Sequence, residues 1–354
     1  MVRSRRFRSD EAVNILRNDI VLGKYRVGIF LPSERKLTEI LEVSRGTVRC
    51  ILKQLQEESL IRINPGRGAY VAETVERKGL KRFIVFMSGI APLGRANEGV
   101  GVLLGICRGA SKLHAEAVIS FTRDEEIVQE AISRYAAGEI QGLIYSDCSD
   151  YDKFIAPLEK NGIPYAVTNL EFDIPALAAR MDLRSVGRAA GRHLASLGHK
   201  NIGILSGPTD KFIYREILAG FRGALAEDEI QLEHIAEVNS ESEPSRIAAL
   251  EMLSLPNRPS AIFASRDIRA AGCYAACREL GLKIPEDLSI AAYDDITWPE
   301  GRNAGLDTVR EPIEEMGEAS VELLQEWIIS GKKPESRIFK GEMTVRNSSK
   351  KLEN

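Results

Sequence analysis

Residues 31–49 read LPSERKLTEILEVSRGTVR, and residues 60–71 read LIRINPGRGAYV. In the first stretch, Ser33 and Ser44 can each cap a helix, and apolar residues recur at helical spacing after each of them. The second stretch alternates as a strand, turns at a glycine-rich tip and returns as a strand. We therefore predict a winged helix-turn-helix, a fold that places its second, basic helix in the major groove of DNA.

The charge of the chain is unevenly distributed. Residues 1–72 hold 14 Lys and Arg against 8 Asp and Glu, whereas the rest of the chain holds 34 against 43. A basic head on an acidic body localises contact with a polyanion to the head.

Basic and hydroxyl side chains lie where the predicted recognition helix begins. Arginine can bind guanine through two hydrogen bonds, which suits Arg45 and Arg49, and Thr47 can contact a phosphate or a thymine methyl group. Arg67 places a charge at the glycine tip, where the backbone can approach phosphate closely. The alternatives are a solvated basic helix and a winged helix that contacts only proteins; the agreement of caps, helix spacing, basic face and wing favours DNA.

Residues 8–73 closely resemble the GntR family of bacterial regulators, through the two stretches quoted above. In that family the Arg of the PSER segment, the residues that open the third helix and the glycine segment of the wing contact DNA. The resemblance implies DNA contacts here at Arg35, Ser44, Arg45, Gly46, Thr47, Arg49, Gly66 and Arg67. Gly46 and Cys50 differ from the residues common in the family, so the base preference can differ too.

The remainder of the chain has a different pattern. Residues 73–81 are charged and aperiodic, as in a linker, and short apolar strands then alternate with amphipathic helices over 82–348, before a tail at 349–354. Such alternation predicts doubly wound parallel sheets that bind ligands beyond the carboxyl ends of their strands. Strands are expected at 83–87, 117–121, 142–145, 165–167, 201–205, 261–264 and 288–293, and helices at 98–114, 124–137, 152–161, 183–197, 213–227, 244–254, 267–280 and 312–330.

Residues 81–348 resemble the LacI/GalR family of sugar-responsive regulators, whose core is akin to periplasmic sugar-binding proteins. The resemblance rests on the ordered set GRHLASLGHKNI (191–202), Arg215 ahead of AGF (219–221), PSAIFA (259–264) and IPEDLSI (284–290) leading to YDD (293–295). It implies two α/β subdomains joined by three crossovers, with the effector between them. We place the N-subdomain at 82–168 plus 311–333 and the C-subdomain at 169–310 plus 334–348. A GntR-like head on a LacI-like body is the arrangement of the arabinose-repressor type of regulator.

Polar residues after the strands are the candidates for effector binding. The resemblance implies that Arg215, Asp294 and Asn169 bind the effector. Arg266 stands where many members have Asn; it either pairs with Asp294 or adds a second charge beside Arg215. The second case favours an acidic ligand, a uronate or phosphosugar, over the neutral sugar usual in the family. The other candidates, several of them possible caps or turn residues, are Ser88, Ser146, Asp147, Asp210, Asp267 and Asp295.

Other classes of protein fit less well. The segment GVGVLLG (99–105) has poor spacing for a dinucleotide loop, so a Rossmann-like enzyme is only a remote alternative. Five scattered cysteines and no apolar run of about 18 residues are typical of a cytoplasmic protein without disulfides or membrane spans. We predict a non-enzymatic, homodimeric repressor that binds operator DNA, needs no cofactor or metal, and responds to a small carbohydrate-like effector. The effector can instead act as a co-repressor, and we expect the dimer surface on helices such as 98–114.

Overall fold

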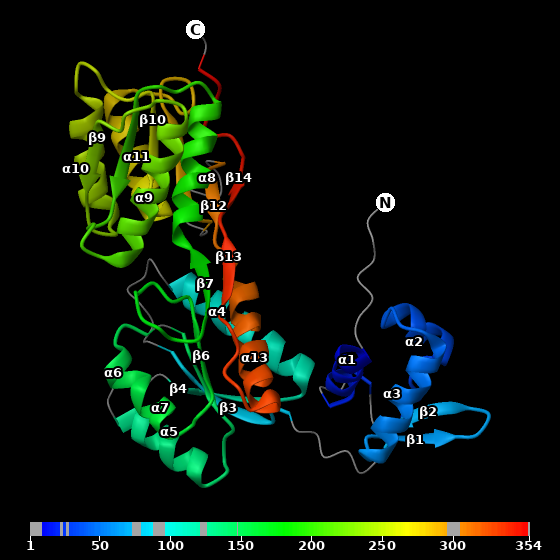
Figure 1. Cartoon of the computed structure of the whole chain (residues 1–354). Coiled ribbons are helices and arrows are strands. Elements are labelled where there is room, and N and C mark those ends of the chain that lie inside the picture. Colours follow the sequence, from blue (N-terminus) through cyan, green and yellow to red (C-terminus); the bar gives the residue numbers. More distant parts are fainter. Residues whose placement is uncertain are drawn as a thin grey trace.

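The computed structural model describes residues 9–21, 24–25, 28–72, 79–87, 96–120, 126–146, 148–295 and 305–352 (Figure 1). The head contains the predicted helices and hairpin. Its elements are α1 (Ser9–Val21), α2 (Glu34–Ile40), α3 (Arg45–Glu57), β1 (Ile61–Asn64) and β2 (Gly68–Val71). Both predicted caps are confirmed, because Ser33 Oγ accepts from the Lys36 N–H at 3.3 Å and Ser44 Oγ accepts from the Thr47 N–H at 3.1 Å.

One hydrophobic cluster holds the head together. The four residues of α3 expected to face inward, Val48, Ile51, Leu52 and Leu55, are all buried, together with apolar residues of α1, α2 and the hairpin. The segment before α2 extends the hairpin, since the Leu31 N–H donates to the Ala69 carbonyl at 2.8 Å. The inward face of α3 is therefore fixed by the core, and its polar face is left to solvent.

The body contains two six-stranded sheets, each covered by helices (Figure 1). The N-subdomain sheet has the order β13-β7-β6-β5-β3-β4, and the C-subdomain sheet has the order β14-β12-β11-β10-β8-β9. All neighbouring strands are parallel except β14, which runs antiparallel to β12. This confirms the predicted doubly wound α/β architecture.

The elements of the N-subdomain are β3 (Arg82–Phe86), α4 (Ala96–Leu113), β4 (Glu116–Ser120), α5 (Glu126–Ala136), β5 (Leu143–Tyr145), α6 (Tyr151–Phe154), α7 (Ala156–Lys160), β6 (Tyr165–Thr168), β7 (Ala178–Asp182), α13 (Ile313–Ser330) and β13 (Arg337–Lys340). Those of the C-subdomain are α8 (Leu183–Ser196), β8 (Ile202–Ser206), α9 (Phe212–Glu227), β9 (His234–Glu237), α10 (Ser242–Leu253), β10 (Ala261–Ala264), α11 (Asp267–Leu280), β11 (Ser289–Asp294), β12 (Asp307–Arg310) and β14 (Glu342–Thr344).

The expected subdomain boundaries need a correction. Strands β7 and β13 were assigned by sequence to the C-subdomain, but both belong to the N-subdomain sheet. Strand β7 pairs with β6 before the chain crosses over at Asp182, whose side chain caps α8 by accepting from the Ser185 N–H at 3.1 Å. The other crossovers follow β12 and β13, and at the last of them Gly341 lies so close to Val186 that a Cβ would be 2.8 Å from its Cα.

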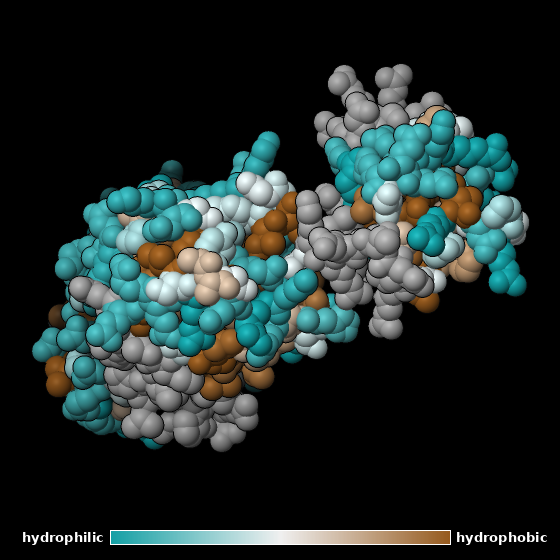
Figure 2. All heavy atoms as spheres, turned by 90° about the horizontal axis from the view of Figure 1, so that it is seen from below, coloured by the Kyte–Doolittle hydropathy of each residue, from teal (hydrophilic) through white to brown (hydrophobic). Residues whose placement is uncertain are grey.

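Helix α4 packs closely on α13 through glycines. A Cβ on Gly105 would lie 2.0 Å from the carbonyl oxygen of Glu314, so only glycine permits this approach. Elsewhere on α4 the side chains of Val100 and Leu104 are exposed. Figure 2 shows hydrophobic patches separated by hydrophilic surface on the face seen from below. The GVGVLLG segment is therefore a helix with a small-residue face. None of the described helices is long and apolar enough to cross a membrane.

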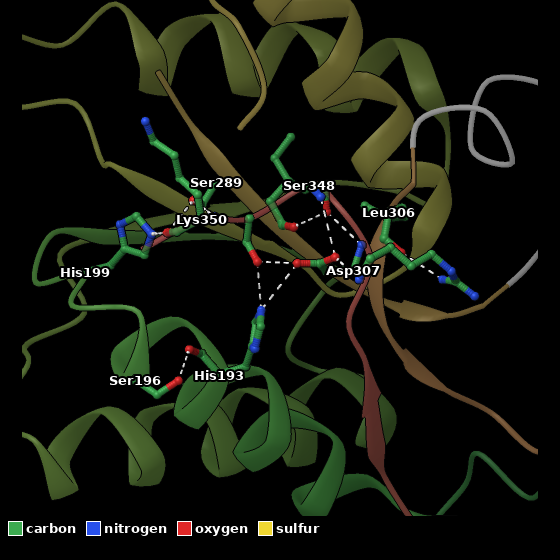
Figure 3. A network of polar contacts seen from close by, with 11 residues as sticks. His193, Ser196, His199, Ser289, Leu306, Asp307, Ser348 and Lys350 are labelled. Atoms are coloured by element: carbon green, nitrogen blue, oxygen red, sulfur yellow. Dashed lines mark hydrogen bonds and ion pairs between the residues drawn. The ribbon is translucent and has the colours of Figure 1, made fainter. Parts of the chain in front are cut away.

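The last described residues, 346–352, are hydrogen-bonded to the C-subdomain (Figure 3). His193 Nε2 lies 2.8 Å from Ser349 Oγ and 3.4 Å from Asp307 Oδ2, and His199 Nε2 lies 3.2 Å from the Lys350 carbonyl oxygen. Burial alone would raise the pKa of Asp307, but hydrogen bonds from His193 and Ser349 lower it. Both contacts of His193 use the same ring nitrogen. We interpret the network as a structural one that holds residues 346–352 against the C-subdomain.

A second polar cluster, in the N-subdomain, gives a pH-dependent prediction. The Glu159 carboxylate accepts from Lys333 Nζ at 2.5 Å, Tyr165 Oη at 2.6 Å and Tyr151 Oη at 2.7 Å. Burial alone would raise the pKa of Glu159, but these bonds lower it from 4.5 to about 2. Because the folded-state pKa is the lower one, the stabilisation is present above pH 4.5 and is lost as the pH falls toward 2.

We expect Glu159→Gln to lower the free energy of unfolding at pH 7 by about 1 kcal/mol, since partial exposure screens the charges. The difference from the wild type should stay nearly constant from pH 7 to about 5 and shrink as the pH falls from 4.5 toward 2 in urea-unfolding series. Glu139→Gln, which changes an exposed carboxylate of the same subdomain, is the control and should show little effect at any pH. An equal difference at all pH values would contradict a role for the Glu159 charge.

Candidate DNA-binding head and effector site

The guanidinium groups of Arg45 and Arg49 share one carboxylate. Both Nε atoms lie 3.1 Å from Glu34 Oε2, and the two arginine side chains are 68% and 65% exposed. Hydrogen bonds from Arg45, and then from Arg49, lower the pKa of Glu34. Glu34, in the first turn of α2, thus holds two arginines side by side at the start of α3, with most of each guanidinium open to solvent.

The other predicted DNA contacts lie at the head surface. Arg35 is 89% exposed, and Arg67 is exposed at the wing tip beside Gly66, whose φ of +81° suits glycine. Ser44 and Thr47 are already linked, since their hydroxyl oxygens lie 2.8 Å apart beneath the helix cap. Gly46 is exposed between them. The predicted contacts therefore occupy the first turns of α2 and α3 and the tip of the wing.

In the body, Arg266 joins the two subdomains. It precedes α11, is 2% exposed, and its Nη1 donates to Asp294 Oδ1 at 2.8 Å. Its Nη2 donates to the carboxylate of Glu171. Asp294 ends β11 in the C-subdomain, whereas Glu171 follows β6 in the N-subdomain. Of the two roles considered for Arg266, the structure shows pairing with Asp294, and it adds a carboxylate from the other subdomain.

A second buried arginine lies one helical turn later. Arg269 Nη2 donates to the Val238 carbonyl at 3.0 Å and to Ser240 Oγ at 3.1 Å, and its guanidinium lies 4.7 Å from the centre of the Tyr214 ring. Burial lowers the pKa of Arg269. Burial alone would raise the pKa of Tyr214, but the charges of Arg266 and Arg269 lower it. Two positive charges therefore act on the Tyr214 hydroxyl.

The predicted effector residues are only partly brought together. Ser146 and Asn169 follow β5 and β6 and are half-buried, and Asn169 has a φ of +59°. Arg215 is exposed on α9, where its guanidinium carbon lies 5.5 Å from the Phe212 ring centre and its Nε lies 4.0 Å from Glu216 Oε1. Ser88 and Asp147 lie outside the described residues.

The remaining candidates have structural partners or are exposed. Asp267 is buried and accepts from Thr308 Oγ1 at 2.9 Å, and Asp295 accepts from Arg346 Nη2 at 2.7 Å. Asp210 is exposed in the segment before α9. The described residues contain no group of three or more His, Cys, Asp or Glu side chains that could hold a metal ion.

Three residues that surround the buried arginines, or are one of them, were not predicted from the sequence: Glu171, Tyr214 and Arg269. Glu171 is a polar residue that follows a predicted strand, which is the same criterion that made Asn169 a candidate. Tyr214 is adjacent to Arg215, and one residue along a helix rotates a side chain by about 100°, so the buried neighbour was overlooked. Arg269 lies in the first turn of a predicted helix, three residues after Arg266.

Two family models match the chain in separate regions. Residues 8–71 match the gntR family of bacterial regulatory proteins, and residues 192–349 match a periplasmic binding protein-like domain. The first match covers the winged helix of the head, and the second covers most of the C-subdomain together with α13 and β13 of the N-subdomain.

Individual proteins extend this similarity. The transcriptional repressor PurR of Photobacterium profundum is 30% identical over 224 residues, which are 61% of this chain and 66% of the relative. The chain spans about half to two thirds of the curated relatives it matches. A LacI family regulator from Enterococcus faecium with bound ribose has a TM-score of 0.64 at 25% identity, covering 77% of this chain and all of that one. The lac repressor dimer bound to operator and an anti-inducer shares the fold, with a TM-score of 0.64 at 23% identity over 79% of this chain and 99% of that one.

Proposed function

We propose that this chain, a GntR-family winged-helix head joined to a periplasmic-binding-protein-like body with the fold of LacI family regulators, is a transcriptional repressor controlled by a small effector. DNA binding is supported above all by Arg45 and Arg49, which Glu34 holds together and exposed at the start of α3. Two guanidinium groups held in place near the N-terminus of a recognition helix are suited to contact base edges in the major groove. The head spans residues 1–72, 73–81 form the linker, and the protein acts in the cytoplasm on operator DNA.

Control by an effector is supported by the position of Arg266. Its guanidinium is bound by a carboxylate of each subdomain, so a change in the distance between Glu171 and Asp294 changes its contacts. An effector that binds one arrangement of the subdomains better shifts the population toward it, by no more than its difference in affinity for the two. The effector is a small carbohydrate-like molecule that binds between the carboxyl ends of the two sheets, near Ser146, Asn169, Arg266 and Asp294.

The protein acts as a homodimer, because a two-fold dimer matches an operator with two half-sites. Exposed Val100 and Leu104 on α4 support a dimer surface there, since apolar side chains at 56% and 51% exposure gain from mutual burial.

We expect Leu104→Glu to convert the dimer into monomers, because a carboxylate in an apolar interface must lose its hydration. Sedimentation equilibrium measures this directly, and operator affinity should fall with it. Val345→Glu, which changes an even more exposed apolar residue beyond β14, is the control and should leave the dimer intact. An unchanged dimer in Leu104→Glu would place the interface elsewhere.

The experiment for effector control starts with a thermal-shift screen of the full chain against sugars and sugar acids, since a ligand that binds the native state stabilises it by mass action. The ligand found in this screen is then added to a complex of the protein with a DNA duplex that it binds specifically, obtained by selection from random sequences. Fluorescence anisotropy reports whether the DNA is released or retained. Release identifies an inducer, and tighter binding identifies a co-repressor. An unchanged DNA affinity at saturating ligand would contradict effector control.

A further inference from the structure

A row of buried hydroxyl groups crosses the carboxyl edge of the C-subdomain sheet. Extension of the strand register places Ser206 of β8 beside Ser265, which follows β10, and Ser265 beside Tyr293 of β11. The residues before them, Leu205, Ala264 and Ala292, face α10 and α11, so alternation turns all three hydroxyl side chains to the face covered by α8 and α9. Among the described residues none of these three hydroxyls has a hydrogen-bond partner.

Arg269 brings a positive charge to the same edge. Its guanidinium lies against the Tyr214 ring, which in turn fills the space beside Gly207, where a Cβ would be 2.1 Å from the ring. Gly207 directly follows Ser206. Arg269 Nη1 is buried and has no hydrogen-bond partner among the described residues, although Nε and Nη2 are bonded. Through Tyr214 and Gly207, the Arg269 guanidinium is therefore placed at the same edge of the sheet as the row of hydroxyls.

The two buried arginines differ in how their charge is balanced. Arg266 is held by the carboxylates of Asp294 and Glu171, so its charge is already compensated. The hydrogen bonds of Arg269 go to a carbonyl and a hydroxyl, and no ion pair joins it to a carboxylate among the described residues. The carboxylate of Asp294 acts on Arg269 only through its charge and not through a direct ion pair. A buried charge without a bonded counter-ion is costly, and a guanidinium donor bonds most strongly to an anionic oxygen.

We propose that the effector carries an anionic group, a carboxylate or a phosphate, which binds Arg269 Nη1 and the hydroxyl groups of Ser206 and Ser265. This inference rests on the proposed effector-controlled function and narrows its ligand to acidic sugars and sugar phosphates. Arg269 is the residue that selects for the anion, whereas Arg266 serves the contact between subdomains.

The test is calorimetric titration of the full chain with matched ligands. The probes are glucose, glucuronate and glucose 6-phosphate; galactose and galacturonate; and ribose and ribose 5-phosphate. We expect an anionic member to bind roughly 10-fold or more tightly than its neutral parent, as a charge-assisted bond replaces a neutral one. The comparison of uronates with phosphates identifies which anion the site takes.

Variants assign that preference to a residue. Arg269→Met should abolish the difference between the anionic ligand and its neutral parent, and Arg269→Lys, which keeps the charge but loses the planar fork, should retain part of it. Arg222→Met, which changes an exposed arginine of α9, is the control and should bind like the wild type. If Arg269→Met does not fold, the reduced preference of Arg269→Lys carries the test.

The outcomes separate this inference from the proposed function. Equal or tighter binding of a neutral parent overturns the anionic class but leaves a sugar effector in place. An anionic preference that persists in folded Arg269→Met, or is undiminished in Arg269→Lys, overturns the role of Arg269. If none of the probes binds, the anionic class and the sugar-type effector both fail, while DNA binding is judged by its own measurement.

Discussion

Arg266→Met should lower the free energy of unfolding by about 3–5 kcal/mol, which is the usual cost of removing one partner from a buried ion pair. The reason lies in what remains: Asp294, whose side chain is 1% exposed, and Glu171, at 14%, would each keep a buried carboxylate that has lost its bond to the guanidinium. The substitution also removes the cation–π contact between the Arg266 guanidinium and the Tyr293 ring, whose centre lies 5.5 Å away. Urea unfolding of the full chain, monitored by circular dichroism, measures the change.

Arg222→Met is again the matched control, since a substitution at an exposed position away from such contacts changes stability by about 0.5 kcal/mol or less. A second variant, Glu171→Gln, keeps the shape and removes only the carboxylate from the N-subdomain. It should destabilise the chain less than Arg266→Met, because Asp294 still pairs with Arg266. If Arg266→Met lowered the free energy of unfolding by less than about 1 kcal/mol, Arg266 would not form a buried ion pair with Asp294 and Glu171.

Arg49→Ala should relax the choice of base at one position of the DNA site, by about 1–3 kcal/mol if Arg49 binds guanine through two hydrogen bonds. The side chain is 65% exposed, and Glu34 fixes its Nε, which leaves the outer guanidinium nitrogens for a base. Competition titrations with duplexes that vary one base pair at a time measure the discrimination lost at each position.

Lys53→Ala separates base recognition from charge, because Lys53 lies on the same helix and is 79% exposed. Its loss should weaken binding similarly for all duplexes and reduce the salt dependence by about one phosphate contact. If Arg49→Ala behaved in the same way, with an unaltered base preference, Arg49 would be a phosphate contact instead.

The head was predictable because its signals are local. Ser33 and Ser44 cap helices by bonding backbone within three residues, and the inward face of α3 follows from apolar spacing alone. The pairing of Arg45 and Arg49 with Glu34 was not foreseen, since it depends on how α2 crosses α3 and not on the pattern of either helix.

In the body, strands with weak apolar patterns could not be predicted from the sequence. Buried strands such as β10 were found from their apolar runs, but β7 carries Arg180 at its centre and β13 is an edge strand with Ile338 half exposed, so both patterns are weak. Strand β7 also had to be paired with β6 before the subdomain boundary could be placed.

The effector site illustrates the same limit at the level of single residues. The pairing of Arg266 with Asp294 was one of two options that the sequence offered, and the structure selects it. The carboxylate of Glu171 joins them only because the subdomains meet there, a contact between residues 95 positions apart. Tyr214 and Arg215 differ by one position, yet helix rotation buries the first and exposes the second.

The most direct test of the central claim is selection of DNA by the purified full chain from a pool of random-sequence duplexes. The account predicts enrichment of a pseudo-palindrome whose half-sites are about one helical turn, or a multiple of it, apart. A variant with both Arg45→Ala and Arg49→Ala should not enrich that sequence. If the wild type enriched no sequence, or the double variant enriched the same one equally well, the claim that α3 makes this chain a sequence-specific DNA-binding regulator would be contradicted.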